Sequence, residues 1–498
     1  MTKKILKVLL IALILLMPKS IFASQSLEKN VIEYRLSNGM LWLLIPERES
    51  PTFFGAIAVR TGGIDEKDGK TGIAHMFEHM AFKGSERLGT TDFKKEKPIL
   101  EKIFRVSEEM TEEILKSKPD QKMIKELKQK LANLETQAKK LQKPNDVFKT
   151  LQRNGAQDLN AYTTKDMTLF HTSLPKDRIE LFGDVFSQMV FHPVFRDFYT
   201  ERSVVSTERS SRVENNPSGL IYDKLLNIAF ANGPYSFSTI GLKNDIDRLT
   251  VKDAKEFFST YYIPINMVGV IVGDIDIGRT KRMLNLYFGS RPKGKKPPKP
   301  GQSEPMGDKS LTIESFASPA MILAYHKPTY PSSDATTFDV LAYLLCDEDV
   351  GYLEKSLIKE KKIASYIYCS DSYPGLRQQN LFLIYAQPRD GISLKRLEAS
   401  IKKEIEIGRS KEITREDLKR IQNRINLGYY LAMSDNTGLA QVLVNSQVLK
   451  GSWKDAFQYP KEIARVTPDQ ISSLYPKYIT KENSVVIYRN KGSKRRGG

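Results

Sequence analysis

The chain has 498 residues, a formal net charge of +18, five histidines and two cysteines. Because one hydrophobic core rarely organises so long a chain, we expect at least two domains. The excess of Lys and Arg lies in loops, an inserted helical segment, a linker and the C-terminal tail, without a nucleic-acid-binding motif. A solvated basic surface explains this charge, and no nucleic-acid partner is expected.

The N-terminus has the pattern of a secretory leader. Lysines precede an apolar run at 8–17, and small residues follow it at 20–25. This order predicts a signal peptide over 1–24. The ten apolar residues of the run are too few to cross a bilayer, and no later stretch is long enough. We therefore expect an exported protein, periplasmic or secreted, without a stable membrane anchor.

The next predicted elements are strands. The segment 31–47 predicts a β-hairpin whose tight turn is Asn38–Gly39. A further strand at 53–63 leads into a helix-like segment, and a buried strand is predicted at 267–274.

The helix-like segment is 72-GIAHMFEHMAFKG-84, which contains two of the five histidines. At helical spacing its apolar residues form one stripe, made of Ile73, Met76, Phe77 and Met80. His75, Glu78 and His79 fall on the opposite side. Histidines at i and i+4 can share a metal, and Glu78 is placed to accept a proton from a metal-bound water. The alternative is a helix with two surface histidines beside a surface glutamate, but the full H-x-x-E-H string favours zinc.

A catalytic zinc needs a third protein ligand, and the best candidates lie in 198-FYTERSVVSTERSSRVEN-215. One helical stripe holds Phe198, Glu201, Val204, Val205 and Glu208. Both glutamates thus share a face with valines that we expect to be buried. A buried carboxylate needs a partner, either a metal or an arginine across the packing of the helix.

A helical hairpin is predicted at 97–145. In its second helix, apolar residues recur at alternating intervals of three and four, which indicates an a/d seam. The seam residues are Ile124, Leu127, Leu131, Leu134, Ala138 and Leu141. Together with the apolar residues Ile99, Ile103, Val106 and Met110 before Pro119, they predict an antiparallel helical hairpin. The hairpin is either a simple outward projection or an element that gates a substrate cavity or docks a partner.

A linker rich in Pro, Gly and Lys, 291–308, separates a second unit. Strands and helices alternate there, with strands at 320–328, 364–372, 380–388 and 484–490 and a helix near 336–347. His326 lies in the first of these strands without a partner, which favours a structural role. Cys346 and Cys369 could form one disulfide or remain two buried thiols, and the sequence does not choose between them.

The motif His75-x-x-Glu78-His79, followed by E-R-S-V-V-S-T-E from Glu201 to Glu208, resembles the pitrilysin/insulinase group of zinc peptidases, the inverzincins. Over most of 30–490 the chain is similar to the mitochondrial processing peptidase-like branch and its bacterial relatives. The supporting stretches are 160-NAYTTKDMTLF-170, 233-GPYSFSTIG-241, 257-FFSTYYIPINMVGVIVGD-274 and 383-LIYAQPRDG-391. The resemblance implies an α+β fold of two homologous α/β-sandwich halves, with mostly antiparallel mixed sheets covered by helices. The implied domains are 25–290 with the zinc site and the insert, 309–490 without zinc, and a basic tail at 491–498.

The resemblance also implies residue roles. His75, His79 and Glu208 would bind Zn²⁺, Glu78 would be the general base, and Glu201 would orient a ligand. The strand residues Asn160, Ala161 and Tyr162 would pair with the backbone of an extended peptide substrate, although an ordinary sheet edge is the alternative. The implied function is zinc-dependent endopeptidase activity; the alternative is an inactive structural or peptide-binding subunit.

A partner chain is also expected. In the resembling family, the half that faces the zinc supplies an Arg followed by a Tyr that contact the substrate. This chain offers Arg377, Tyr385 and Arg389 near that place, and none has the matching order and spacing. We therefore expect a clamshell heterodimer with a homologous zinc-less subunit, or otherwise a homodimer.

Overall fold

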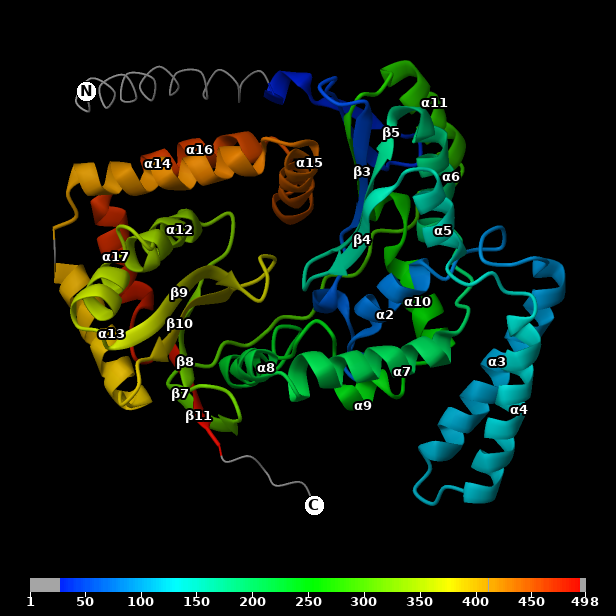
Figure 1. Cartoon of the computed structure of the whole chain (residues 1–498), viewed down its shortest axis with the longest axis horizontal. Coiled ribbons are helices and arrows are strands. Elements are labelled where there is room, and N and C mark those ends of the chain that lie inside the picture. The colour runs from blue at the N-terminus through cyan, green and yellow to red at the C-terminus, as the bar shows by residue number, and fades with distance from the viewer. Residues whose placement is uncertain (1–26, 411, 493–498) are drawn as a thin grey trace, which may run out of the picture.

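The computed structural model describes residues 27–410 and 412–492, which form two α/β halves with one mixed sheet each (Figure 1). The first sheet has six strands in the order β1-β2-β6-β3-β5-β4, in which β2 and β6 are parallel and the other neighbours antiparallel. Its strands are β1 (Ile32–Arg35), β2 (Leu41–Pro46), β3 (Thr52–Val59), β4 (Gln157–Thr163), β5 (Thr168–Pro175) and β6 (Met267–Gly273). The predicted turn at Asn38–Gly39 joins β1 to β2, and Gly39 takes the left-handed φ of 89° that this turn requires.

The second sheet has five strands in the order β7-β11-β8-β10-β9, with a parallel β7–β11 pair and antiparallel pairs elsewhere. Its strands are β7 (Lys309–Ser315), β8 (Ala320–Lys327), β9 (Ala364–Tyr373), β10 (Asn380–Pro388) and β11 (Ser484–Lys491). The predicted fold class, two α+β halves with mixed and mostly antiparallel sheets, is confirmed.

The first half contains a series of helices, most of which cover one face of the first sheet. They are α2 (Ile73–Ala81), α3 (Phe93–Ile114), α4 (Gln121–Lys139), α5 (Asp146–Arg153), α6 (Ile179–Phe191), α7 (Phe198–Arg209), α8 (Pro217–Ala229), α9 (Lys243–Ile246), α10 (Val251–Tyr261) and α11 (Ile277–Phe288), with short 3-10 or π turns η1 (Gly63–Asp65), η2 (Lys176–Arg178), η3 (Ser210–Glu214) and η4 (Pro264–Asn266). Trp42 of β2 is fully buried between Phe182 of α6 and Phe288 of α11, so these helices form the main core with the sheet.

The second half is built in the same way. Its helices are α12 (Ser333–Cys346), α13 (Leu394–Ser410), α14 (Arg415–Ala432), α15 (Asn436–Asn445), α16 (Asp455–Arg465) and α17 (Pro468–Tyr478), with π turns η5 (Glu354–Glu360) and η6 (Ser446–Lys450). Helices α12, α13, α14 and α17 form a core with one face of the second sheet. Cys346 at the end of α12 and Cys369 of β9 form a disulfide, so of the two states that the sequence allowed, the structure has the bridge.

The two halves exchange covering helices, an arrangement that the linear domain pattern did not predict. Helix α15 packs on the face of the first sheet opposite α6 and α11, where Leu443 and Val444 join a core with Leu43 and Phe54 (Figure 1). Conversely, α8 packs on the second sheet, where Leu225 joins a core with residues of β8, β10 and β11. Each sheet is therefore covered on both faces, and the halves form one continuous body (Figure 1).

The segment between the halves, 291–308, follows the surface of the first half in an extended path. The backbone N–H of Ala231 donates to the carbonyl of Glu304 at 2.9 Å, and the N–H of Met306 donates to the carbonyl of Ala229 at 2.8 Å. The Pro- and Lys-rich connection is therefore anchored at its C-terminal end, beside α8.

The predicted hairpin consists of α3 and α4, which lie side by side and project from the body (Figure 1). Its distal part has a small core of its own, made of Val106, Met110 and Leu127, with Leu131 and Leu134 packed against it. The predicted leader, 1–24, lies outside the described residues. Within the described ranges, no helix combines the length and the apolar character needed to cross a bilayer.

Candidate metal centre

Helix α2 presents its two faces as the spacing predicts. All four stripe residues are buried, and Phe77 packs on Tyr262 with 4.0 Å between ring centroids. The helix starts after Gly72, whose φ of 88° is left-handed and allows the sharp entry. With the apolar stripe held in the core, His75 and His79 point away from it, one helical turn apart.

Helix α7 brings the two glutamates to the same place, although one packing prediction for it is wrong. Val205 is buried, but Val204 is 46% exposed. A stripe spanning i, i+3, i+4 and i+7 is wider than the contact that α7 makes, so Val204 falls at its solvent edge. Glu201 and Glu208 remain partly buried and face α2.

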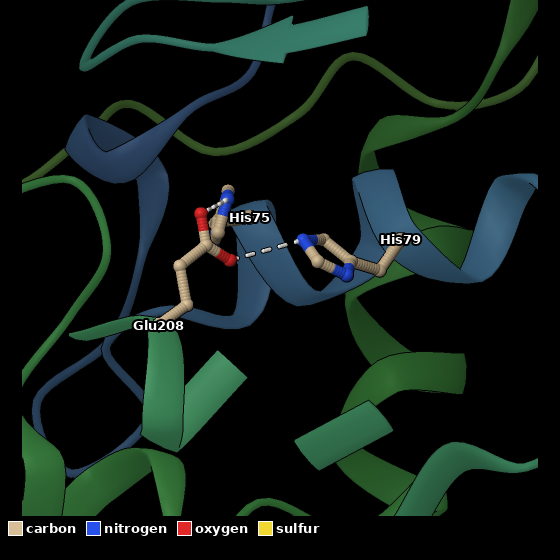
Figure 2. A group of neighbouring side chains, drawn as sticks. All are labelled: His75, His79 and Glu208. Atoms are coloured by element: carbon tan, nitrogen blue, oxygen red, sulfur yellow. Dashed lines mark ion pairs between the residues drawn. The ribbon is translucent and has the colours of Figure 1, made fainter. Parts of the chain in front are cut away.

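Three of the predicted side chains converge (Figure 2). Glu208 lies between the histidines: its Oε1 is 3.9 Å from Nε2 of His75, and its Oε2 is 3.4 Å from Nε2 of His79. One potential ligand atom from each residue lies within 4.8 Å of the others, and within the described ranges no other group of His, Cys, Asp or Glu meets this condition. Residues more than a hundred positions apart in the chain thus form one potential ligand set.

The electrostatics of the histidines differ. Burial lowers the pKa of His75 to about 4, so its ring is neutral at pH 7. Burial would also lower the pKa of His79, but hydrogen bonds to Glu201 and Glu208 raise it to about 9. Without a metal, a proton on His79 therefore contributes, together with Lys83 and Arg212, to balancing the carboxylates on α7.

This donor set fits a zinc ion. Two imidazoles and one carboxylate are the protein ligands of several catalytic zinc sites, which leave a fourth position open. The neutral ring of His75 already has the protonation state that metal binding requires. A cation between the rings would replace the proton on His79 as the partner of Glu208.

Glu78 lies beside the triad and is oriented by strand β4. Its Oε2 accepts a hydrogen bond of 2.6 Å from Oγ1 of Thr163. Burial raises the pKa of Glu78, although the hydrogen bond from Thr163 acts in the opposite direction. Glu78 and His79 line a cavity of about 310 Å³, which is also lined by the segment 142–148 after the hairpin.

Glu201 contacts His79 on the side of the ring that faces away from Glu208. Its Oε2 is 3.4 Å from Nδ1 of His79, the ring nitrogen that faces away from Glu208, and its other oxygen accepts a hydrogen bond from Lys83. Such a carboxylate fixes the tautomer and orientation of the ring. This position agrees with the orienting role that the resemblance implies.

Three contacts at the site were missed in the sequence: Thr163 on Glu78, Lys83 on Glu201, and Arg212, whose Nη2 lies 2.8 Å from Oε1 of Glu208. Arg212 follows Glu208 by four residues, so the i, i+4 rule could have suggested this contact, whereas the contact of Lys83 with Glu201 joins segments distant in the sequence and has no such signal. Thr163 carries no such signal, because its contact depends on how β4 packs against α2.

Strand β4, which contains Asn160, Ala161 and Tyr162, is the edge strand of its sheet and pairs with β5 alone. A bulge between Gln157 and Asn160 interrupts the pairing. The strand ends at Thr163, so its free edge runs toward Glu78.

Two family models match the chain. The model described as "Insulinase (Peptidase family M16)" matches residues 46–97 and 127–242, and the one described as "Peptidase M16 inactive domain" matches 248–425. The gap between the two matched stretches of the first model, 98–126, falls within the projecting hairpin. The first model contains all the residues of the candidate metal centre.

Relatives are found over most of the chain. It is 25% identical over 396 residues to a protein named zinc protease PqqE of Helicobacter pylori, which covers 78% of this chain and 76% of that protein. The fold matches the crystal structure of a protease from Helicobacter pylori with a TM-score of 0.76 and 22% identity, over 92% of this chain and 99% of that one. It also matches the periplasmic protease PqqL from Escherichia coli with a TM-score of 0.68 and 17% identity, over 93% of this chain but only 48% of that one. Together the two family models match most of both halves of the chain, and the chain belongs to the insulinase family of peptidases, family M16.

Proposed function

We propose that this protein is a zinc-dependent endopeptidase. One observation carries the proposal: His75, His79 and Glu208 converge within 4.8 Å, next to Glu78 and a cavity that Glu78 lines. A scaffold that had lost its activity would have no reason to keep both the ligand set and a hydrogen-bonded carboxylate beside it.

Each residue of the site has its own role in the proposed peptide hydrolysis. His75, His79 and Glu208 hold the zinc ion, which when bound activates water and polarises the peptide carbonyl. Glu78 takes one proton from the attacking water and returns it to the nitrogen of the leaving amine as the C–N bond breaks. Glu201 keeps the ring of His79 in place, and Thr163 keeps the Glu78 carboxylate directed at the site.

The substrate lies along the edge of the first sheet. An extended peptide that pairs with Asn160, Ala161 and Tyr162 of β4 would pass the end of the strand at Thr163, where Glu78 lies. Backbone pairing of this kind binds peptides or unfolded segments with little dependence on their side chains. The neighbouring cavity of about 310 Å³ is large enough for one substrate side chain.

We infer that a homologous second subunit completes the enzyme. The three candidates of the second half for substrate contact are engaged within the chain: Arg377 pairs with Asp65, the hydroxyl of Tyr385 accepts a hydrogen bond from Gln387, and Arg389 donates to the carbonyl of Ala364. The chain also spans 48% of the periplasmic protease PqqL, which leaves room there for a second unit of this size. A zinc-less partner or a second copy would supply the contacts that face the zinc.

The deciding experiment compares the wild type with Glu78→Gln. Zinc content of the purified protein is measured together with cleavage of a quenched-fluorescent peptide library. We expect near-stoichiometric zinc in both proteins and cleavage only by the wild type. Zinc without cleavage would direct the search to the partner subunit. Absence of zinc would overturn the proposal in favour of an inactive peptide-binding subunit.

The site of action is inferred separately. The basic and apolar start of the chain lies outside the described residues, and export rests on that sequence pattern alone. Cell fractionation with N-terminal sequencing of the mature protein tests it, with a new N-terminus near residue 24 as the expected result.

A further inference from the structure

A loop of the second half reaches the first half next to the metal centre. It connects β9 to β10 and comprises residues 374–379. The backbone N–H of Leu376 donates to Oδ2 of Asp166 at 2.5 Å, and the N–H of Arg377 donates to the hydroxyl of Tyr235 at 3.1 Å. Because Tyr235 also donates to Oδ1 of Asp166 at 2.9 Å, the loop, the tyrosine and the aspartate form one closed network.

The side chain of Arg377 extends this network to a second segment. Its two Nη atoms donate to the two carboxylate oxygens of Asp65 at 2.8 and 3.1 Å, and Nη1 also donates to the carbonyl of Asp166 at 3.3 Å. The side chains of Arg377 and Asp65 are 12% and 2% exposed, so this bidentate pair is largely shielded from water. Bidentate pairs of this kind fix geometry as well as charge.

The two segments that Arg377 joins are those that place Glu78. Asp65 precedes Glu66, whose Oε1 accepts a hydrogen bond of 2.9 Å from the N–H of Ala74 in the first turn of α2. Asp166 lies in the turn after β4, three residues beyond Thr163, which donates to Glu78. One guanidinium therefore touches both the segment that caps the catalytic helix and the turn that orients its glutamate.

The two segments are also paired directly, which makes them a single unit. The N–H of Gly63 donates to the carbonyl of Thr164 at 3.1 Å, and the N–H of Ile64 donates to the carbonyl of Lys165 at 2.8 Å. Arg377 adds a charged contact to this short pairing. We call the loop 374–379, with its contacts to Asp65, Asp166 and Tyr235, the latch. The latch belongs to the second half, which supplies none of the three potential metal ligands.

We propose that Arg377 is a positioning residue for catalysis, through which the second half holds Glu78 in register with β4. This inference rests on the proposed peptidase function and gives a role to the part of the chain whose model is described as inactive. It differs from simple domain adhesion, because loosening these contacts would free the first turn of α2 and the turn after β4, so that the Glu78 carboxylate loses its orientation by Thr163, while a bound metal would still hold His75, His79 and Glu208 together.

Gly375 offers a second way to disturb the same latch. A Cβ atom there would lie 2.5 Å from the hydroxyl of Tyr235 and 2.8 and 2.9 Å from the carboxylate oxygens of Asp166. Gly375→Ala therefore displaces the loop without removing the charge of Arg377. Gly428, in α14, is the matched control, because a Cβ there would have no atom within 4 Å.

The test uses the full chain and two readouts. Arg377→Gln, Arg377→Lys and Gly375→Ala are compared with Gly428→Ala and with Arg424→Gln, which removes an arginine that pairs with Asp347 and Asp349 inside the second half. The first readout is kcat and KM for a quenched peptide, with zinc content. The second is hydrogen–deuterium exchange of amides 73–82 in metal-free protein, which requires no activity.

We expect Arg377→Gln and Gly375→Ala to lower kcat about tenfold or more at unchanged zinc content and nearly unchanged KM, and to accelerate exchange in α2. Arg377→Lys should restore part of kcat, and both controls should behave as the wild type. If the latch variants lower only the melting temperature, with kcat and α2 exchange unchanged, the proposal is overturned. If the wild type itself does not cleave peptides, the proposed function fails while the exchange readout still decides the positioning role. Should Arg377→Gln fail to fold, Gly375→Ala alone decides.

Discussion

Thr163 Oγ1 donates a hydrogen bond of 2.6 Å to Oε2 of Glu78, which ties the last residue of β4 to the helix that carries both histidines. The residue that we propose as general base is thus hydrogen-bonded directly to the strand that we propose to hold the substrate. A peptide paired with β4 would have its backbone placed relative to Glu78 by the strand itself. In the proposed mechanism this link orients Glu78 relative to the substrate, as the three ligands would position the metal.

The first prediction concerns this hydrogen bond. Thr163→Val keeps the β-branched shape that suits a strand but removes the donor to Glu78. We expect kcat for a quenched peptide to fall about tenfold, with zinc content unchanged, because the carboxylate loses its fixed orientation. Thr163→Ser, which keeps the hydroxyl, is the control and should stay close to the wild type. Equal activity of the valine variant would show that the link is dispensable.

The second prediction separates zinc affinity from catalysis. Glu201→Gln weakens the contact with Nδ1 of His79 and removes the charge that faces Lys83. Since partners of this kind tune metal affinity, we expect zinc to bind about 10- to 100-fold more weakly, as measured by competition with a chromogenic chelator. With saturating zinc, kcat should change little. Glu256→Gln, at an exposed ion pair with Lys67, is the matched control and should leave zinc affinity unchanged.

The third prediction concerns the disulfide. It joins the end of α12 to β9, with Cα atoms 5.6 Å apart and 23 positions between the cysteines. Replacing both Cys346 and Cys369 by Ala should lower the free energy of unfolding by about 3 kcal/mol, because the unfolded chain is no longer cross-linked. Urea unfolding measures the loss. Reductant should destabilise the wild type by a similar amount and leave the variant unaffected; thiols that react in the native wild type would contradict the bridge.

Local patterns predicted much of the fold and part of the site. The stripe on α2 is buried as expected, because the spacing of apolar residues in a short amphipathic helix determines which of its faces packs into the core. Glu208 was predicted from a helical stripe and a motif, and the structure brings one potential ligand atom of it and of each histidine within 4.8 Å of the others. Other features depend on how elements distant in the sequence pack together. They are the exposure of Val204, the hydrogen bond from Thr163 to Glu78 and the ion pair of Arg377 with Asp65. No short stretch of sequence contains both partners of such a contact.

The exchange of covering helices was missed for the same reason. Helix α8 precedes the linker and α15 follows it, yet each packs on the sheet of the other half. Amphipathic spacing shows that a helix has an apolar face but not which sheet that face covers. The Pro-rich connection suggested separate units, whereas the buried faces form one interlocked body.

The last prediction follows from His326, the histidine of the second half for which the sequence offered no partner. Its side chain is almost completely buried, its Nε2 lies 3.0 Å from the carbonyl of Met306, and its ring meets Phe230 edge-on. The contact with a carbonyl means that Nε2 carries the proton of a neutral ring. Burial lowers the pKa of His326, while the backbone contacts oppose that shift.

The sign of the resulting pH dependence follows from the two states. The unfolded chain takes up a proton near pH 6.5, whereas folded His326 resists protonation until its lower pKa is reached. Between these values the unfolded state binds more protons, so the contribution of this residue to stability is fully present above pH 6.5 and falls as the pH drops.

His326→Gln keeps an N–H donor for the carbonyl of Met306 but cannot titrate. The stability advantage of the wild type over this variant, measured by urea unfolding at pH 7.5 and 5.0, should therefore shrink at the lower pH. Because the other histidines are common to both proteins, their titration cancels in the comparison, and a constant difference would show that His326 is protonated in the folded protein as readily as in the unfolded chain.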